Sequence, residues 1–586
     1  MRLEEYWGIG PKTRDLLVES LGAEAAIESI ESGDVRTLTA AGLPRGRATR
    51  ILRHAHGGEA MDVLATRDSR QVYKELLDII SEYAVTADAA DRIRILTPLS
   101  SPEAMQDRLA NVHEARQSWE SLDDDQQTAV LEAFEAYDEA TNGERAAVQA
   151  ALSLRSTGLE SGVFEPLATL DEDRLDDAVS ALTGLAGEDG SVGEGADDRL
   201  DSMREQLATI EDLRATPASV LEAAQSGARG TAQFRDALVE EIASEANIGI
   251  SQVQEAMPRE AADAQAFVGE ALRTLASRLR EEVAEREEEV AAELEYTLAR
   301  AREDIDAAVA AIDEISLAVS LSRFAAAFNL VEPVFRDEAV TGVVDARNVF
   351  LEDAGDSVQP ITYAVGNHSL SVPGATIPPK NDRVAVLTGA NSGGKTTLLE
   401  TLCQVQLLAQ MGLPVPAEQA EIHAVDAIVF HRRHASFNAG VLESTLRSVV
   451  PPLTDTGRTL MLVDEFEAIT EPGSAADLLH GLVTLTVEKD ALGVFVTHLA
   501  DDLEPLPPEA RVDGIFAEGL TTDLELEVDY QPRFETVGRS TPEFIVSRLV
   551  ADASDRGERA GYETLAAAVG EKAVQRTLVD AKWTDS

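Results

Sequence analysis

A glycine-rich loop between two ordered patterns holds the residues with the clearest chemistry in this chain. The apolar run Val384–Leu387 precedes Gly389, and a Gly-Lys-Thr triplet at 394–396 follows after four residues, where a helical pattern begins. Glycines let backbone N–H groups turn toward an anion, and the start of a helix adds partial positive charge. The lysine of such a loop reaches the β- and γ-phosphates, and the next hydroxyl ligates Mg²⁺. We therefore predict an ATP site formed by Gly389, Ala390, Asn391, Ser392, Gly393, Gly394, Lys395, Thr396 and Thr397.

Two further apolar runs end in polar residues that suit phosphate chemistry. Leu460–Val463 is continuously apolar, which is typical of a buried parallel strand, and Asp464 and Glu465 follow it. Gly493–Val496 is followed after one residue by His498, and ligands gather at the carboxyl ends of parallel strands. An acidic pair can also be an ordinary strand exit, and a histidine here can be a cap or a surface residue. We predict a catalytic group and metal ligands at this edge: Lys395, Glu465 and His498 for catalysis, and Thr396 and Asp464 for Mg²⁺.

These strands and the loop require an α/β core, which the pattern places within a domain at residues 336–530. Its first part switches to short strand-like runs, such as Ala339–Val344 and Ser369–Val372. The tail at 531–586 is expected to form helices suited to packing or dimerisation.

The region 60–335 is predicted to be helical, with a glycine-rich break at Gly184–Gly195. Residues 270–332 contain neither glycine nor proline, and their apolar positions recur every three, four or seven residues. This spacing predicts one very long helix, a lever of roughly 90 Å at 1.5 Å per residue. Its charged residues, such as Arg280 and Arg286, are expected to form a solvated surface.

Residues 1–56 form a distinct unit that resembles the tandem helix-hairpin-helix module. Gly8-Ile9-Gly10 lies between two helical patterns, and Ala41–Arg47 repeats the arrangement about 34 residues later. In this module, backbone N–H groups of the glycine turns meet DNA phosphates without reading bases. A hairpin that docks another protein is the structural alternative. The resemblance implies DNA contacts at Gly8, Gly10, Lys12, Gly42, Arg45, Gly46 and Arg47.

The charge of the chain is strongly uneven. The whole chain carries a formal net charge of -56, whereas its first 56 residues hold eight basic and eight acidic side chains. With 44% hydrophobic residues, such acidity predicts a folded protein in a salt-rich cytoplasm, and hence a halophilic, haloarchaeal source. The single cysteine, Cys403, indicates a reducing interior. No stretch approaches the roughly 20 apolar residues of a membrane span, so we expect a soluble, cytoplasmic protein.

Five segments of the C-terminal half carry a set of motifs in a fixed order: Val344–Leu351, Thr388–Thr397, Gly412–Ile422, Ala435–Thr445 and Phe495–His498. Together they resemble the MutS family of DNA mismatch-repair ATPases. The resemblance implies a multidomain α and α/β fold: a helix-hairpin-helix unit, a long helical lever or clamp region and an ABC-type P-loop ATPase domain. It also implies ATP and Mg²⁺ as cofactors, and a homodimer in which Ser436 of one subunit meets the γ-phosphate held by the other.

The departures from the family pattern narrow the expected function. The helical region is preceded by no Phe-x-Glu wedge of a mismatch-reading domain, and the loop after Glu465 keeps Thr470-Glu471-Pro472. The chain is therefore similar to the MutS branch that lacks the mismatch-reading domain. We expect an ATP-dependent DNA clamp that acts on mismatched or branched DNA in repair or recombination.

Two other classes of protein stay open as alternatives. An architectural ATPase of the SMC type would need a Leu-Ser-Gly-Gly signature and split ATPase halves, whereas here all motifs lie in one contiguous block. A non-hydrolysing, nucleotide-dependent scaffold would tolerate a degenerate site, and the intact Lys395, Thr396, Asp464 and Glu465 argue against it.

Overall fold

The computed structural model divides the chain into two compact units. One comprises Met1–Gln127 and Ile315–Ser586, and the other comprises Thr128–Glu314. Helices and two sheets occur together, which confirms a multidomain α and α/β protein. The described residues are 2–140, 143–186, 191–226, 231–371, 376–389, 394–433, 439–454, 457–469, 472–503, 505–520, 526–538, 545–546, 549–550, 553 and 555–569.

The first helices of the chain form a small bundle with its own core. They are α1 (Pro11–Ser20), α2 (Ala23–Glu31), α3 (Val35–Ala40) and α4 (Arg45–Gly57). Leu17, Ile30, Leu38 and Leu52 are fully buried at its centre. Asp34 caps α3 because its side chain accepts the backbone N–H of Thr37 at 2.9 Å.

The next helices belong to the same unit as the sheets. They are α5 (Arg67–Glu82), α6 (Ala87–Arg94) and α7 (Pro102–Glu120). Thr66, which caps α5, donates its hydroxyl to the carbonyl of Phe430 (2.6 Å) and accepts the N–H of Phe430 (3.1 Å). These buried bonds fix the start of α5 to the edge strand of the larger sheet.

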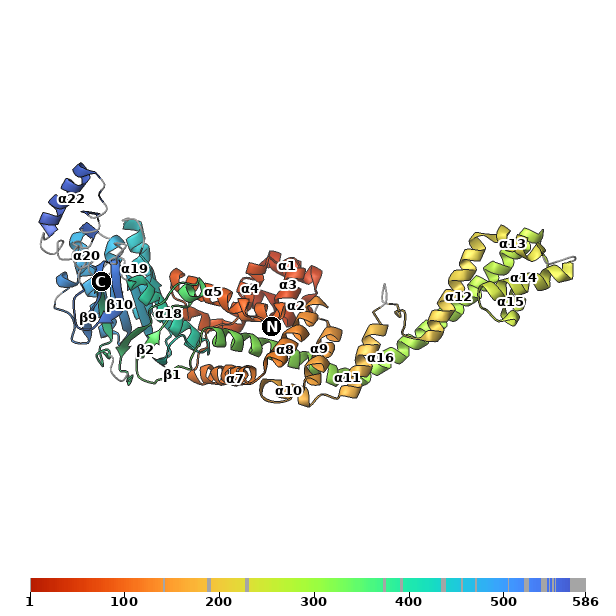
Figure 1. The fold of residues 1–586 in the computed structure, drawn as a ribbon, viewed down its shortest axis with the longest axis horizontal. Coiled ribbons are helices and arrows are strands. Elements are labelled where there is room, and N and C mark those ends of the chain that lie inside the picture. Colours follow the sequence, from red (N-terminus) through yellow and green to blue (C-terminus); the bar gives the residue numbers. More distant parts are fainter. Residues whose placement is uncertain are drawn as a thin grey trace. The chain divides into compact units, whose positions relative to one another are not determined.

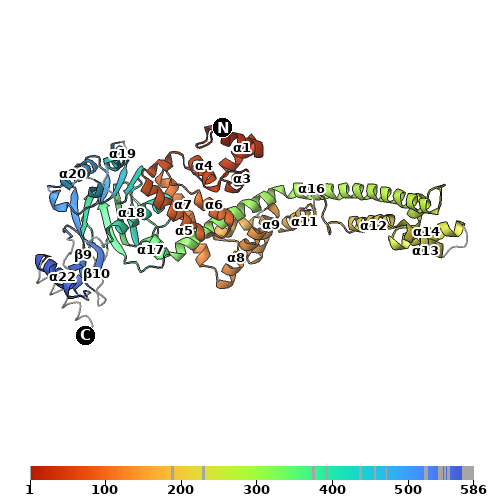
Figure 2. The same ribbon diagram turned by 90° about the horizontal axis from the view of Figure 1, so that it is seen from above.

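Short helices lie beside one very long helix over residues 124–327, a range that includes the whole second unit. They are α8 (Asp124–Glu139), α9 (Glu144–Ser156), α10 (Glu165–Ala168), α11 (Glu172–Gly184), α12 (Asp198–Ala215), α13 (Pro217–Ser226), α14 (Thr231–Glu245) and α15 (Ile250–Ala256). The long helix α16 runs from Ala264 to Ala327 over 64 residues, where the sequence predicted 270–332. Figure 2 shows its length beside α9, α11 and α12.

Apolar and charged contacts both attach α16 to its neighbours. Leu272, Leu275 and Leu279 are buried in a cluster with residues of α12–α15. Arg286 pairs with Asp197 at 2.8 Å. The expectation of a wholly solvated charged surface is therefore wrong for Arg286, whose side chain is 18% exposed because it lies against α12.

The larger sheet has six strands in the order β10-β9-β4-β8-β7-β6. They are β4 (Val384–Gly389), β6 (Ala427–His431), β7 (Thr459–Asp464), β8 (Leu492–Val496), β9 (Ala510–Leu520) and β10 (Leu526–Arg533). All neighbours are parallel except β9 and β10. The predicted strands at 460–463 and 493–496 are confirmed, and their carboxyl ends lie at the same edge as the end of β4.

Helices cover both faces of this sheet (Figure 1). They are α18 (Lys395–Gln410), α19 (Ala439–Thr454) and α20 (Pro472–Glu488). Side chains alternate along β4, so Ala385 and Leu387 share a core with α18, while Val384 and Val386 share a core with α20. Burial on both faces explains why these strands are apolar throughout.

A four-stranded sheet, β1-β5-β2-β3, accompanies the larger one. Its strands are β1 (Val334–Phe335), β2 (Val340–Ala346), β3 (Ile361–Gly366) and β5 (Gln419–Ile422), and α17 (Val349–Asp353) follows β2. The predicted strand at Ser369–Val372 is wrong for its described residues, because Ser369 instead bonds the Glu421 carboxylate through its backbone N–H (2.8 Å). In the tail, α22 spans Arg556–Val569. None of the described helices is both long and apolar enough to cross a membrane.

Candidate nucleotide-binding site

The two glycines that flank the loop after β4 have the backbone conformations that a phosphate cradle needs. Gly389 has a φ of 130°, and a Cβ there would lie 2.2 Å from the carbonyl oxygen of Ile515, so no other residue fits. Gly394 is left-handed, with a φ of 68°, and directly precedes the first turn of α18. Of the predicted loop residues, Ala390, Asn391, Ser392 and Gly393 lie outside the described residues.

Lys395 is buried at the start of α18. Its Nζ donates to the carbonyl of Gly389 at 2.7 Å, so the ammonium joins the start of α18 to the end of β4. Burial lowers the pKa of Lys395, while the nearby carboxylates of Glu465 and Asp464 act to raise it. A phosphate at this position would supply the negative charge that stabilises the buried ammonium.

Thr396 and Asp464 meet, although 68 residues separate them. The hydroxyl of Thr396 donates to Oδ2 of Asp464 at 2.6 Å, and Asp464 is the last residue of β7. Burial raises the pKa of Asp464, so its ionised form is costly without a cation. Two adjacent oxygen donors fit Mg²⁺, which takes few protein ligands and completes its octahedron with water and phosphate oxygens. Within the described part of the chain, no cluster of three or more metal-ligating side chains competes with this pair.

Glu465 is held by a histidine and an arginine side chain. Its Oε1 is 2.8 Å from Nε2 of His498, and its Oε2 is 2.6 Å from Nη1 of Arg433. Its backbone has a φ of 41°, which turns the chain sharply after β7. The hydrogen bond from His498, aided by the charges of His498, Arg433 and Lys395, lowers the pKa of Glu465 against the effect of burial. The carboxylate is thus ionised, and both its oxygens are engaged.

Two residues of this cluster were missed at the sequence level. Glu467 accepts the hydroxyl of Thr497 (2.8 Å) and the backbone N–H of His498 (2.7 Å), which fixes the loop that presents the histidine. Arg433 lies two residues beyond β6, whose carboxyl end is at the same sheet edge. The position of Arg433 after an apolar run was the available signal.

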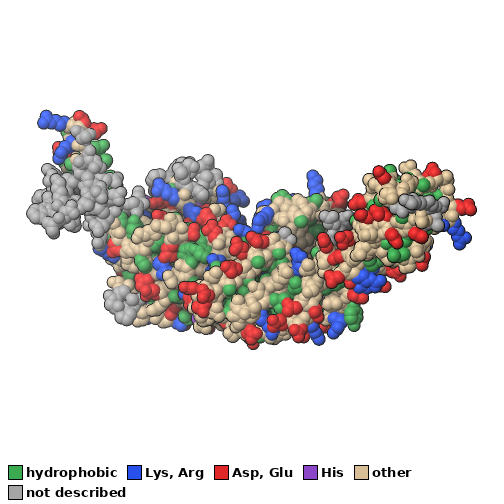
Figure 3. All heavy atoms as spheres, turned by 45° about the vertical axis from the view of Figure 1, so that its right-hand side comes forward, with side chains coloured by type: hydrophobic (Ala, Val, Ile, Leu, Met, Phe, Trp, Pro, Cys, Tyr) green, Lys and Arg blue, Asp and Glu red, His purple; other side chains and the backbone are tan. Residues whose placement is uncertain are grey.

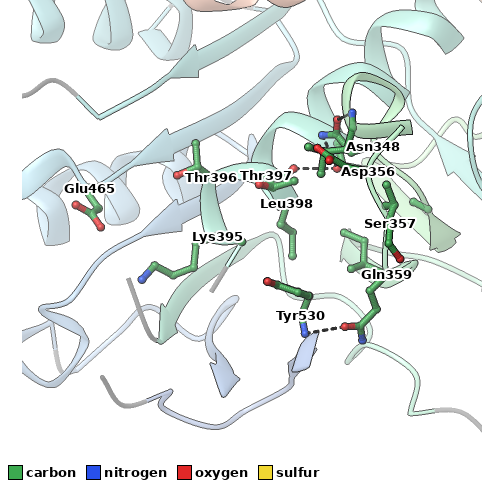
Figure 4. Close-up of a pocket in the computed structure, with 16 residues that line it drawn as sticks. Asn348, Asp356, Ser357, Gln359, Lys395, Thr396, Thr397, Leu398, Glu465 and Tyr530 are labelled. Atoms are coloured by element: carbon green, nitrogen blue, oxygen red, sulfur yellow. Dashed lines mark hydrogen bonds between the residues drawn. The ribbon is translucent and has the colours of Figure 1, made fainter. Parts of the chain in front are cut away.

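A cavity of about 530 Å³ opens beside the loop. Figure 4 shows Glu465 and Lys395 toward one end and Gln359 toward the other. Tyr530 forms part of the wall, and its backbone N–H donates to Oε1 of Gln359 at 3.1 Å. A Cβ on Gly394 would lie 2.7 Å from the Tyr530 ring, so this glycine also makes room for the wall. The sequence offered no signal for this wall, because Gln359 and Tyr530 come from distant parts of the chain.

The predicted helix-hairpin-helix glycines form two tight turns. Gly8 has a φ of 80° and Gly42 a φ of 98°, and each turn leads into a helix, α1 or α4. Nη2 of Arg47 joins the turns, since it donates to the carbonyl of Gly8 (3.2 Å) and to the hydroxyl of Thr13 (2.6 Å). Arg45 pairs with Asp91.

The remaining predicted residues are placed as follows. Gly10 precedes α1, Lys12 is exposed on its first turn, and Gly46 lies in the first turn of α4. Thr397 lies in the first turn of α18 and lines the cavity. Ser436, predicted to act in the partner's site, lies outside the described residues.

Residues 385–503 match the family model of MutS domain V. The "DNA-binding protein MutS2" of Pyrococcus furiosus is 44% identical over 231 residues, which are 39% of each chain. The "Endonuclease MutS2" of Thermus thermophilus is 31% identical over 176 residues, 29% of this chain and 23% of the relative. The "DNA mismatch repair protein MutS" of Natronomonas pharaonis is 31% identical over 275 residues, 43% of this chain and 30% of the relative. The chain thus spans less than two fifths of the length of these relatives.

Proposed function

The similarity at residues 385–503 confirms the resemblance to the MutS family, and from this premise we propose that the protein is a MutS-like ATPase that binds DNA under the control of ATP. The observation that supports this most is the convergence of Lys395, Thr396, Asp464, Glu465 and His498 at one edge of the six-stranded sheet. Each has the chemistry that its place in an ATPase requires.

ATP would occupy the loop and the adjoining cavity. Lys395 would turn from the Gly389 carbonyl to the phosphates, and Thr396 and Asp464 would hold Mg²⁺. The ion, when bound, neutralises charge on the phosphate oxygens. The remainder of the nucleotide would extend toward Gln359 and Tyr530, where the cavity has its other wall.

Glu465 would orient the attacking water. In the described arrangement its two oxygens are engaged by Arg433 and His498, so it is not free to accept a proton from water. A γ-phosphate would attract these two side chains, and their movement would release the carboxylate. Hydrolysis would then depend on the phosphate itself to free the base.

DNA binding is proposed for the N-terminal bundle. In the described part of the chain, Lys12, Arg47 and Arg50 are exposed and make no ion pair, whereas Arg14 pairs with Glu4. We further propose mismatched or branched DNA as the target, and a homodimer whose Ser436 completes the partner's site. We also propose that the region 60–335 acts as a lever and that residues 531–586 serve in packing or dimerisation.

The proposal is tested by DNA binding in molar salt. Matched, mismatched and four-way DNA should be compared with and without ATP and Mg²⁺. Arg50→Ala should weaken binding to all three and reduce the salt slope by about one unit, because one phosphate contact is lost. Arg14→Ala is the matched control and should change neither the DNA affinity nor its dependence on salt. A wild-type protein that binds none of these DNAs contradicts the proposal.

A further inference from the structure

An exposed Trp7 and a half-buried His54 form an aromatic stack on the N-terminal bundle. Their ring centroids lie 3.8 Å apart, and the ring planes are inclined by 23°. Trp7 precedes the first glycine turn and His54 belongs to the last turn of α4, so the stack joins the two halves of the bundle. Trp7 is 54% exposed, although its ring is among the largest apolar surfaces a protein can bury.

Two arginines line the helix face beside this stack. Arg47, Arg50 and His54 follow one another at intervals of three and four residues, which places them on one face of α4. Arg47 donates to the carbonyl of Gly8, the residue next to Trp7. From Arg47 to His54 the helix rises about 10 Å, a distance that one or two nucleotides of an extended strand can follow. Arg50 donates Nε to the carbonyl of Gly46 (3.1 Å) and is exposed.

The charge of this face differs from that of its surroundings. Arg36 pairs with Asp88 at 3.2 Å, and Arg45 pairs with Asp91, so their charges are balanced within the fold. Among the described residues, neither Arg47 nor Arg50 has such a partner. Figure 3 shows acidic side chains spread over the face of the molecule that it displays, in line with the net charge of -56. Two arginines with no carboxylate partner suit the phosphates of a polyanion, and the aromatic stack beside them suits its flat bases.

The chemistry of the stack selects bases over phosphates. Burial lowers the pKa of His54, so the ring is neutral near pH 7 and stacks as an uncharged aromatic. Each base that stacks on an aromatic platform tightens binding by roughly 5- to 150-fold. Bases inside a duplex are already stacked on their neighbours, whereas an unpaired base offers a free face.

We propose that the Trp7–His54 stack binds an unpaired DNA base, and that Arg47 and Arg50 hold the phosphates beside it. This inference rests on the proposed DNA-binding function and names its target more closely. The target is a single-stranded segment, such as the unpaired arm of a fork, rather than an uninterrupted duplex.

Tryptophan fluorescence of the full chain tests the stack directly. Oligothymidylate should quench the emission of the wild type, because a base stacked on Trp7 quenches its indole. Trp7→Phe should abolish this quench yet bind a forked duplex almost as tightly, since phenylalanine still stacks. Trp7→Ala should weaken forked-DNA binding by about tenfold while blunt-duplex binding is unchanged. Tyr296→Ala, at an aromatic residue that is 66% exposed in the other unit, is the control and should have no effect.

The outcomes separate this inference from the proposed function. If oligothymidylate does not quench the wild type, or if Trp7→Ala binds forked DNA like the wild type, the stack does not bind a base and the inference is overturned. Duplex binding that still depends on Arg50 then leaves the proposed function intact. If the wild type binds no DNA of any form, both are overturned.

Discussion

Neutralising Glu465 should separate the binding of ATP from its hydrolysis. Glu465→Gln keeps the shape of the side chain and an oxygen that can accept a hydrogen bond from Nε2 of His498. It removes the negative charge that pairs with Arg433. Glutamine cannot take a proton from water, so hydrolysis should fall by about 10²- to 10⁴-fold, the usual contribution of a general base.

The same substitution should tighten ATP binding. The Glu465 side chain is 9% exposed and that of Arg433 is 55% exposed, so their ion pair lies between the surface and the interior. We take such a half-exposed pair as worth about 1 kcal/mol, the upper end for surface pairs. Without this pair, Arg433 can bind the γ-phosphate, and no carboxylate at position 465 repels that phosphate. ATP affinity should therefore rise by about fivefold or more.

Calorimetric titration with ATP and Mg²⁺ in molar salt measures the affinity, and a single-turnover assay measures hydrolysis. Glu211→Gln removes the charge of a glutamate that pairs with Arg280 in the other unit, and it should alter neither quantity. If the Glu465→Gln variant hydrolyses ATP at the wild-type rate, Glu465 is not the base. Unchanged ATP affinity would refute the release of Arg433.

Other substitutions and conditions give further expected outcomes. Lys395→Met should lower ATP affinity at least 100-fold, because its charge-assisted hydrogen bonds to the phosphates are lost. Its melting temperature should stay almost unchanged, since burial already disfavours the ammonium of Lys395. Calorimetry measures the affinity and thermal unfolding the melting temperature, and a variant that binds ATP with wild-type affinity would contradict this prediction. His498→Ala should raise the pKa of Glu465, whose lowering is due first to the His498 hydrogen bond, so the acid limb of the hydrolysis–pH profile should move to higher pH; an unmoved limb contradicts this. Asp513→Ala should cost about 3–5 kcal/mol in denaturant unfolding, because it removes the nearer carboxylate partner of the Arg511 guanidinium (2.9 Å), which is 4% exposed, and leaves it with Asp382 at 3.6 Å; a loss below about 1 kcal/mol contradicts this. Removal of salt from about 1 M to 0.01 M should unfold the chain by circular dichroism, since a net charge of -56 is then poorly screened; full structure at low salt contradicts a halophilic protein.

Much of the candidate site could be predicted because its residues follow local rules. The continuous apolar runs before Gly389, Asp464 and His498 marked parallel strands, and parallel strands bring their carboxyl ends to one edge. The rule brings Thr396 and Asp464 to the same edge of the sheet, where their side chains meet at 2.6 Å.

The missed residues depend on contacts that no local pattern encodes. Arg433 reaches Glu465 only because β6 lies next to β7, and strand order is a tertiary property. Tyr530 enters the cavity wall through a hydrogen bond with Gln359, 171 residues away. Thr66 caps α5 and also bonds the edge strand of the sheet, 364 residues away in the sequence. Apolar spacing likewise predicted the long helix but not which of its charges would pair.

The central proposal is that occupancy of the ATP site controls the affinity of the protein for DNA. The most direct measurement is the affinity for forked DNA in molar salt with ATP and Mg²⁺, with ADP and without nucleotide, for the wild type and for Lys395→Met. The DNA affinity of the wild type should change with the nucleotide, whereas the variant should give the same affinity in all three conditions. A wild type whose DNA affinity is the same in all three conditions would contradict the proposal.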